Sequence, residues 1–139
     1  MQTALTILKK LESIDVLKSA QQSIEATRDD MVFIQRNQLF RGERPDGQQV
    51  FLAYSPLTVF LKHQKGQPTD RVTRRDTGKY YAGIEVDVKG ELFKIESIDW
   101  KAEMLNEKYG DIGLSKRSKE SYVPILKPVF IGKIKAYLV

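Results

Sequence analysis

The sequence has no cysteine among its 139 residues and a single histidine, His63. Without cysteine the chain forms no disulfide and has no thiolate chemistry, and it suits a reducing cytoplasm. One histidine cannot build the usual histidine-rich metal site. His63 also lies on the polar side of a predicted short helix, which is typical of a solvated surface residue. We therefore expect no cofactor and no metal.

Long apolar runs are also missing. No stretch approaches the roughly 18 apolar residues that a membrane-spanning helix requires. Lys9 and Lys10 follow the first apolar residues, whereas the charges of a secretory signal peptide precede them. We expect a protein with no membrane partner that is made and used in a cytoplasm, or in a particle assembled there.

The composition is that of a folded chain. It is 41% hydrophobic and 29% charged, which is ordinary for a globular protein, and 139 residues suffice for one core. We expect a single domain over residues 1–139. Its parts would be a helical N-terminal region (1–41), a sheet with short helices and a basic loop (42–114), and a C-terminal helix (115–139).

The net charge of +5 is unevenly distributed along the chain. Residues 62–79 hold six Lys or Arg and two Asp, which gives +4, and residues 115–139 hold six Lys or Arg and one Glu, which gives +5. Residues 80–114 hold four Lys and eight acids, which gives −4. The two basic regions would face nucleic acid or an acidic protein partner.

The apolar spacing predicts two helices at the N-terminus. A short one covers residues 3–11. From residue 14 to 40 the apolar positions recur at spacings of three, four and seven, which is typical of a long amphipathic helix. Ser13 would cap its start and Gly42 its end. Such a helix would span roughly 40 Å, and we expect it to lie across a sheet, with part of it packed on another subunit.

Shorter elements are predicted in the middle of the chain. Residues 50–54 read as a strand. Ser55 and Pro56 then start a helix, with Ser55 as the cap and Pro56 at the first helical position, where its missing N–H costs nothing.

Asp99 is the predicted cap of a helix over residues 100–109. The last helix is predicted to open at Ser118 or Ser121. A proline in a helix interior removes a hydrogen bond, so we expect a kink or a new helix start near Pro128.

Between these helices, two alternating runs of apolar residues meet at Lys89, Gly90 and Glu91, which predicts a β-hairpin. The expected fold class is therefore α+β. A small, mostly antiparallel sheet with this hairpin would pack against the long N-terminal helix and the C-terminal helix.

Two patterns suggest hydrolytic chemistry, and both have simpler explanations. Asp76-Thr77-Gly78 matches the short signature of aspartic proteases. However, the neighbouring cations Arg74, Arg75 and Lys79 would hold Asp76 ionised, whereas the protease dyad shares a proton. A turn before a strand explains the three residues more simply, because such short motifs recur by chance.

Glu85 and Asp87 alternate with apolar residues, which puts both carboxylates on the outward face of the hairpin. A solvated sheet face is the simpler interpretation than a two-carboxylate hydrolase. A Ser-His-Asp triad using His63 is possible by composition but has no local signature. We expect no enzymatic activity.

The long polar connection over residues 66–79 is the candidate functional segment, because long loops usually have a role or are mobile. Its cations and the tyrosines that follow form the candidate protein or nucleic-acid interface: Arg71, Arg74, Arg75, Lys79, Tyr80 and Tyr81. Arg and Tyr are enriched at protein interfaces, which favours a protein partner. Basic and aromatic residues together also suit nucleic acid.

Several short signals recur in a particular order. They are a long N-terminal helix, Gly47, Tyr54-Ser55-Pro56-Leu57-Thr58, a Lys-rich loop, Arg75-Asp76-Thr77-Gly78, the hairpin, Glu107-Lys108-Tyr109-Gly110 and a terminal helix. Over about residues 30–135 this order resembles the tail-completion or virion-morphogenesis (neck) proteins of tailed bacteriophages. The family resemblance transfers no catalytic residue.

The resemblance implies a structural virion protein at the head–tail junction, assembled in the host bacterial cytoplasm. Such a subunit would form a homo-oligomeric ring that contacts connector or portal-adjacent proteins on one side and tail proteins on the other, with DNA possible in the channel. Complementary basic and acidic surfaces would suit a ring, because its contacts join two different faces. The alternative is a nucleic-acid-binding protein that uses residues 71–81 and the Lys-rich C-terminus.

Overall fold

The computed structural model describes residues 3–138. The elements in chain order are α1 (Ala4–Glu12), α2 (Val16–Ala26), α3 (Arg28–Phe40), α4 (Pro56–Gln64), α5 (Lys79–Ala82), β1 (Ile84–Lys89), β2 (Leu92–Ser97), α6 (Ala102–Tyr109) and α7 (Lys116–Ala136). The predicted α+β class is confirmed, and the antiparallel sheet among these residues is the single hairpin β1–β2.

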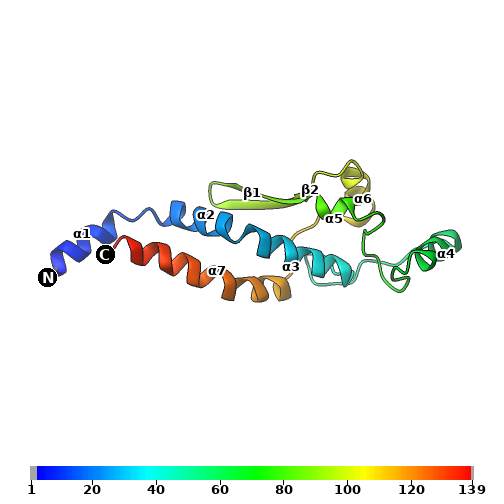
Figure 1. The fold of residues 1–139 in the computed structure, drawn as a ribbon, viewed down its shortest axis with the longest axis horizontal. Helices are drawn as coiled ribbons and strands as arrows, with labels where there is room; N and C mark the ends of the chain where they lie inside the picture. Colours follow the sequence, from blue (N-terminus) through cyan, green and yellow to red (C-terminus); the bar gives the residue numbers. More distant parts are fainter. Residues whose placement is uncertain (1–2, 139) are drawn as a thin grey trace.

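The molecule is elongated along α2 and α3 (Figure 1). In Figure 1 the hairpin lies on one side of these two helices and α7 runs back along the other side, so that both chain ends lie at the same end. We call α2, α3, the hairpin and α7 the helix–hairpin body. At the opposite end α4 projects away from the other helices (Figure 1), and we call residues 50–64 the α4 arm.

The core of the body lies between α3, the hairpin and the start of α7. Its buried apolar residues are Met31, Val32, Ile34, Leu39, Tyr80, Ile84, Val86, Ile95, Leu114 and Tyr122. In the hairpin, Val86 pairs with Ile95 on the buried face, while Glu85 and Asp87 face solvent, as predicted. The apolar face of a sheet is thus covered by an amphipathic helix.

The predicted long N-terminal helix is interrupted at Thr27, which divides it into α2 and α3. The Thr27 hydroxyl lies 2.8 Å from the carbonyl oxygen of Ser23 and shares a hydrogen bond of 2.6 Å with the Tyr122 hydroxyl. Threonine side chains compete in this way with helical backbone bonds. Ser13 ends α1 and Asp15 caps α2 in its place, whereas Gly42, at φ 74°, follows α3 as predicted.

The last helix differs from its prediction at its start and in its middle. Ser115 is the cap, in place of Ser118 or Ser121, and its hydroxyl accepts a hydrogen bond from the Ser118 N–H. The predicted new start near Pro128 is wrong, because α7 continues through Pro124 and Pro128. Both prolines are on the exposed side, where water can satisfy the carbonyls that lose a helical partner.

Two further predictions in the middle of the chain are wrong. Residues 50–54 form no strand: the Val50 N–H donates one hydrogen bond to the Gly42 carbonyl oxygen, and the pairing nearby is one isolated bridge between Glu43 and Gln49. Asp99 is not the cap of α6; Lys101 occupies that position, and the Asp99 carbonyl accepts a hydrogen bond from the Ala102 N–H. The Ser55–Pro56 start of α4 is confirmed.

Candidate protein interface around the basic segment

The basic segment, residues 66–81, is attached to α4 by a side-chain hydrogen bond, which the Lys62 Nζ donates to the carbonyl oxygen of Arg75 at 2.9 Å. Within the segment, the Gln67 Nε2 donates to the carbonyl oxygen of Asp76 at 2.7 Å. Lys65 also forms an ion pair with the Asp76 carboxylate. The segment therefore has a defined position between α4 and α6.

Arg74 is turned inward and joins the basic segment to α6. It is 7% exposed, and its guanidinium donates to the Asn106 Oδ1 at 3.1 Å and to the carbonyls of Tyr109 and Gly110 at 3.2 and 2.7 Å. These carbonyls lie at the C-terminal end of α6, where a cation is favoured by the helix dipole and by unpaired oxygens. Arg74 has a φ of 58°, a conformation that tertiary contacts must hold. Its role in this fold is structural.

The two tyrosines are also used inside the fold. Tyr80 is 4% exposed, and burial raises the pKa of its hydroxyl. The Tyr81 hydroxyl donates to the carbonyl oxygen of Thr73 at 2.6 Å, and burial raises its pKa as well. Neither ring is presented as an open platform on which a nucleic-acid base would stack.

The other three predicted cations lie nearer solvent. Arg71 stacks on the Phe40 ring, with its guanidinium carbon 4.9 Å from the ring centroid, and donates to the Phe40 carbonyl oxygen at 2.7 Å. Arg75 and Lys79 are exposed. The six predicted residues thus do not form one surface, and the interface assigned to them remains a prediction.

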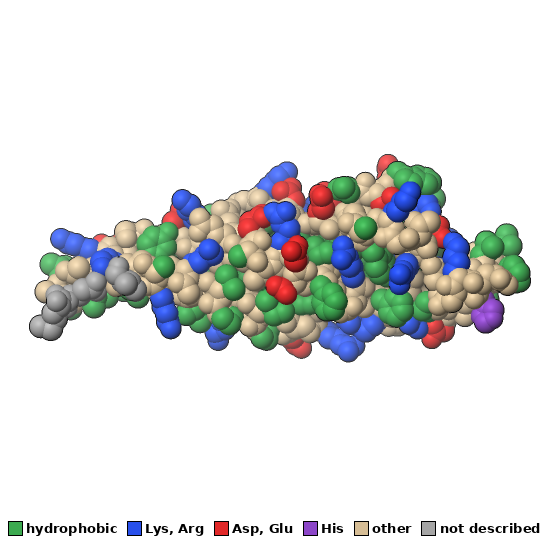
Figure 2. All heavy atoms as spheres, in the orientation of Figure 1, with side chains coloured by type: hydrophobic (Ala, Val, Ile, Leu, Met, Phe, Trp, Pro, Cys, Tyr) green, Lys and Arg blue, Asp and Glu red, His purple; other side chains and the backbone are tan. Residues whose placement is uncertain are grey.

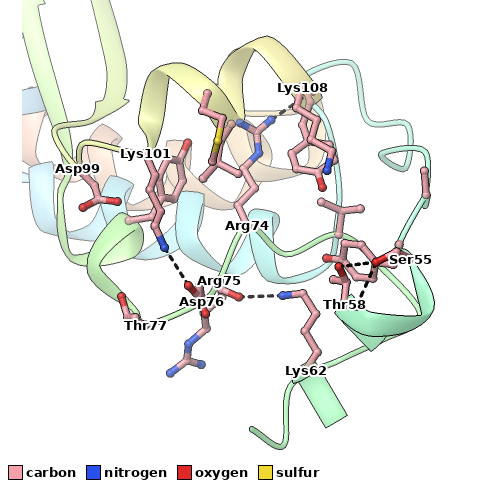
Figure 3. Close-up of a pocket in the computed structure, with 17 residues that line it drawn as sticks. Ser55, Thr58, Lys62, Arg74, Arg75, Asp76, Thr77, Asp99, Lys101 and Lys108 are labelled. Atoms are coloured by element: carbon pink, nitrogen blue, oxygen red, sulfur yellow. Dashed lines mark hydrogen bonds and ion pairs between the residues drawn. The ribbon is translucent and has the colours of Figure 1, made fainter. Parts of the chain in front are cut away.

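Asp76 pairs with two lysines, Lys65 just after α4 and Lys101 just before α6; Figure 3 shows the pair with Lys101. Its carboxylate pairs with Lys101 Nζ at 2.8 Å and with Lys65, and these hydrogen bonds lower the pKa of Asp76 to about 2. The sequence predicted that cations would keep this carboxylate ionised. The cations that do so come from α4 and from the start of α6, not from its chain neighbours.

A cleft of about 320 Å³ opens between the α4 arm, the basic segment and α6 (Figure 3). Its apolar lining comes from Tyr54, Val72, Tyr80, Met104, Leu105 and Tyr109. Its charged lining comes from Lys62, Arg74, Arg75, Lys101 and Lys108 and from Asp76 and Asp99. In Figure 3 the Arg74 side chain points to α6, whereas that of Arg75 points away from it. The cleft is apolar inside with an excess of cations.

Sequence reasoning missed most residues of this cleft. Of the six predicted residues, Arg74, Arg75 and Tyr80 line it, while Arg71, Lys79 and Tyr81 do not. The residues supplied by the α4 arm and α6 had no signal that joined them, because they are separated by some 40 to 50 positions in the chain.

The remaining candidates lie outside the cleft. His63 is exposed on α4, and Asp87 pairs with Lys89 at 3.3 Å. Over residues 3–138, no group of three or more His, Cys, Asp or Glu side chains is arranged to hold a metal ion. In the same part of the chain no helix is both long and apolar enough to cross a membrane.

Comparison of the chain with protein-family models, with curated proteins and with solved structures gives no match.

Proposed function

We propose that the chain is a structural virion protein: a bacteriophage neck or tail-completion subunit that joins the head connector to the tail. In this role it forms a homo-oligomeric ring, contacts connector or portal-adjacent proteins and tail proteins, and is assembled in the host bacterial cytoplasm. The order of sequence signals described above suggests the family. The distribution of apolar surface supports the structural role.

The observation that carries the proposal is the exposed apolar surface of the α4 arm. Phe51 is 83% exposed and Leu57 66%, and Phe60 and Leu61 are exposed beside them. Figure 2 shows hydrophobic side chains at the end of the molecule that α4 occupies, next to the histidine. Contiguous exposed apolar surface is rare on proteins that act alone, and it marks sites of protein contact.

A second apolar surface lies at the other end of the molecule. Leu5, Leu8 and Leu11 of α1 are exposed, as are Val16 and Leu17 at the start of α2. An elongated subunit with different apolar surfaces at its two ends can bind two different neighbours. This is the property that a protein joining two parts of a particle requires.

Light scattering during size-exclusion chromatography tests the proposal. The purified protein should have the mass of several subunits, and negative-stain electron microscopy should show closed rings. A protein that stays monomeric at high concentration, both alone and with its neighbouring neck and tail proteins, would contradict the structural role.

Nucleic-acid binding is the second candidate, and α7 favours it. The helix carries six cations and one acid, and five of those cations are exposed. Repeating the mass measurement with duplex DNA at low and high salt tests this candidate. A monomer that moves onto DNA at low salt and is released at high salt would support it, because phosphate binding weakens steeply with salt.

A further inference from the structure

The cleft between the α4 arm, the basic segment and α6 is chemically selective. Its interior is apolar, and its five cations outnumber its two acids. Asp76 is already paired with Lys65 and Lys101. Arg75 and Lys108 have no ion pair within residues 3–138. A suitable occupant therefore combines an apolar side chain with a carboxylate.

The pairing of Lys62 reinforces this requirement. Its Nζ donates to a backbone carbonyl oxygen and lies 5.3 Å from the centroid of the Tyr54 ring, and it has no acidic partner within 4.0 Å in the described part of the chain. Desolvation lowers the pKa of Lys62. A carboxylate that entered the cleft would stabilise the charged form of this lysine.

The net charges of the exposed apolar segments indicate which of them the cleft would bind. Residues 3–17 have no net charge, and α7 carries +5. The hairpin, residues 84–97, holds four acids and two lysines, a net charge of −2. Ile98 and Trp100 are exposed too, but they flank Asp99 in the wall of the cleft itself. The hairpin is the segment whose charge complements the cleft.

The turn of the hairpin carries the required pair of side chains. Leu92 is 76% exposed, and Glu91 beside it forms no ion pair among the described residues. Gly90, at φ 57°, makes the tight turn, and its carbonyl oxygen accepts a hydrogen bond from Gln21 Nε2 at 2.7 Å. This bond attaches the turn to α2 before it meets a partner, and restraint of this kind reduces the entropy lost on binding.

The turn cannot reach the cleft of its own chain. The cleft adjoins the end of the hairpin where Ser97 leads to Asp99, whereas the turn is at the other end of strands that are six residues long. That length corresponds to roughly 20 Å. In Figure 1 the turn points towards α1, away from α4. A contact between turn and cleft must therefore join two copies, each using a different surface, which is the arrangement that closes into a ring.

We propose that this cleft binds the hairpin turn of a second copy of the chain, with Leu92 on the apolar interior and Glu91 among the cations of Lys62, Arg75 and Lys108. This contact joins neighbouring copies of the chain in the proposed ring. It rests on the proposed function, because that function requires the copies to close into a ring. It uses Tyr54 and Lys62 of the α4 arm, but not the exposed apolar side chains of Phe51, Leu57 and Phe60.

Two sets of charge and size changes test the contact by light scattering and analytical ultracentrifugation. A turn variant, Glu91→Lys with Leu92→Ser, and a cleft variant, Arg75→Glu with Lys108→Glu, should each weaken self-association by about 30-fold or more, the size expected for a hot spot. The matched control is Lys127→Glu with Ile131→Ser on the exposed side of α7, which should leave the mass unchanged. Circular dichroism should show that all variants are folded.

Mixing the two variants gives a sharper result. The turn variant keeps an intact cleft and the cleft variant keeps an intact turn. Together they should form a one-to-one dimer and nothing larger, because the mixture contains only one competent pair of surfaces. The charge exchange Glu91→Lys with Lys108→Glu in one chain should restore part of the lost association.

The absence of cysteine allows a direct test of proximity. Leu92→Cys and Met104→Cys introduce one thiol each, in the turn and in the cleft. Under mild oxidation a mixture of the two should form a disulfide-linked heterodimer faster than either forms with the control Ile131→Cys. Equal rates for all pairs would overturn the contact.

The possible outcomes separate this contact from the proposed function. An oligomer that both variants leave intact overturns the contact alone. A wild-type protein that is monomeric at every concentration overturns the contact and the ring together. Loss of duplex DNA binding in the cleft variant, in a protein that does not self-associate, would assign the cleft to nucleic acid instead.

Discussion

The helix–hairpin body and the α4 arm differ in the exposure of their apolar residues. In the body, Met31, Val86 and Tyr122 are buried against one another from three separate segments. In the arm, Phe51, Leu57 and Phe60 are exposed. The helix of the arm, α4, is instead stabilised locally, by a serine cap and a proline at its first position. The body is stabilised by its own packing. The arm has a defined local structure, but its apolar side chains remain exposed among the described residues, which is the arrangement that the proposed structural role requires.

The largest expected effect comes from opening a cavity in the body. Met31→Ala should lower the free energy of unfolding by about 2–5 kcal/mol, because Met31 is fully buried and its loss leaves a cavity. Urea denaturation followed by circular dichroism measures this change. The control Phe33→Ala, two residues away on the exposed face of α3, should change stability by about 0.5 kcal/mol or less. Equal effects would contradict the assigned buried face.

The next effect tests whether the basic segment is held in place by the bonds of Arg74 to α6. Arg74→Ala should destabilise the protein by about 1–3 kcal/mol, since it removes charge-assisted bonds from a buried guanidinium to the partly buried carbonyls at the end of α6. Arg75→Ala, the adjacent and exposed cation, should cost little. If both variants unfold at the same denaturant concentration, the distinction between the inward and outward arginines is wrong.

A smaller effect concerns the pH dependence of the link between α4 and α6. The pKa of Asp76 is lowered to about 2 in the folded protein, below its value of about 3.9 in an unfolded chain. Its ion pairs therefore contribute stability above about pH 4, and that contribution disappears as the pH falls towards 2. Asp76 is half exposed, so Asp76→Asn should cost less than about 1 kcal/mol at pH 7.

Thermal unfolding of wild type and Asp76→Asn at pH 7, 4 and 2 measures this contribution. The difference between the two proteins should shrink as the pH falls, and it should also shrink in high salt. A difference that grows towards pH 2 would give the carboxylate the opposite role.

The smallest effect on stability is expected in the arm, where the apolar residues are exposed. Phe60→Ser should change the free energy of unfolding by about 0.5 kcal/mol or less, because the ring is exposed in the free chain. Under the proposed function it should nevertheless reduce incorporation into phage particles, measured by complementation of a phage that lacks the gene. A strongly destabilised variant would contradict the exposed position of Phe60, since it would mean that the arm packs on the body.

Local signals predicted much of the fold. The alternation of apolar residues around Gly90 gave the hairpin and its buried face, and Ser55 with Pro56 gave the start of α4. Gly42 ended α3 where its left-handed conformation was expected. These features depend on residues within a few positions of one another, so the sequence alone contains the information.

The features that the sequence did not predict depend on distant partners. Thr27 interrupts the long helix through its bonds to Ser23 and Tyr122, and Tyr122 lies 95 positions away. The strand expected over residues 50–54 does not form, because the pairing near it is limited to one isolated bridge between Glu43 and Gln49.

What the sequence by itself determined about this protein is the set of elements, their caps and turns, and the uneven distribution of charge, since all of these follow from composition and spacing. Only the tertiary structure decided which charges are exposed to a binding partner. It turned Arg74 and Tyr80 inward and brought Lys62 and Lys108 to one cleft, from positions 46 residues apart. The physical reason is that carbonyls at a helix end need hydrogen-bond donors and that burial of an aromatic ring is favourable. The segments that fold against a cation or an aromatic residue therefore determine its role. It either pairs and packs inside the protein or remains exposed to a binding partner.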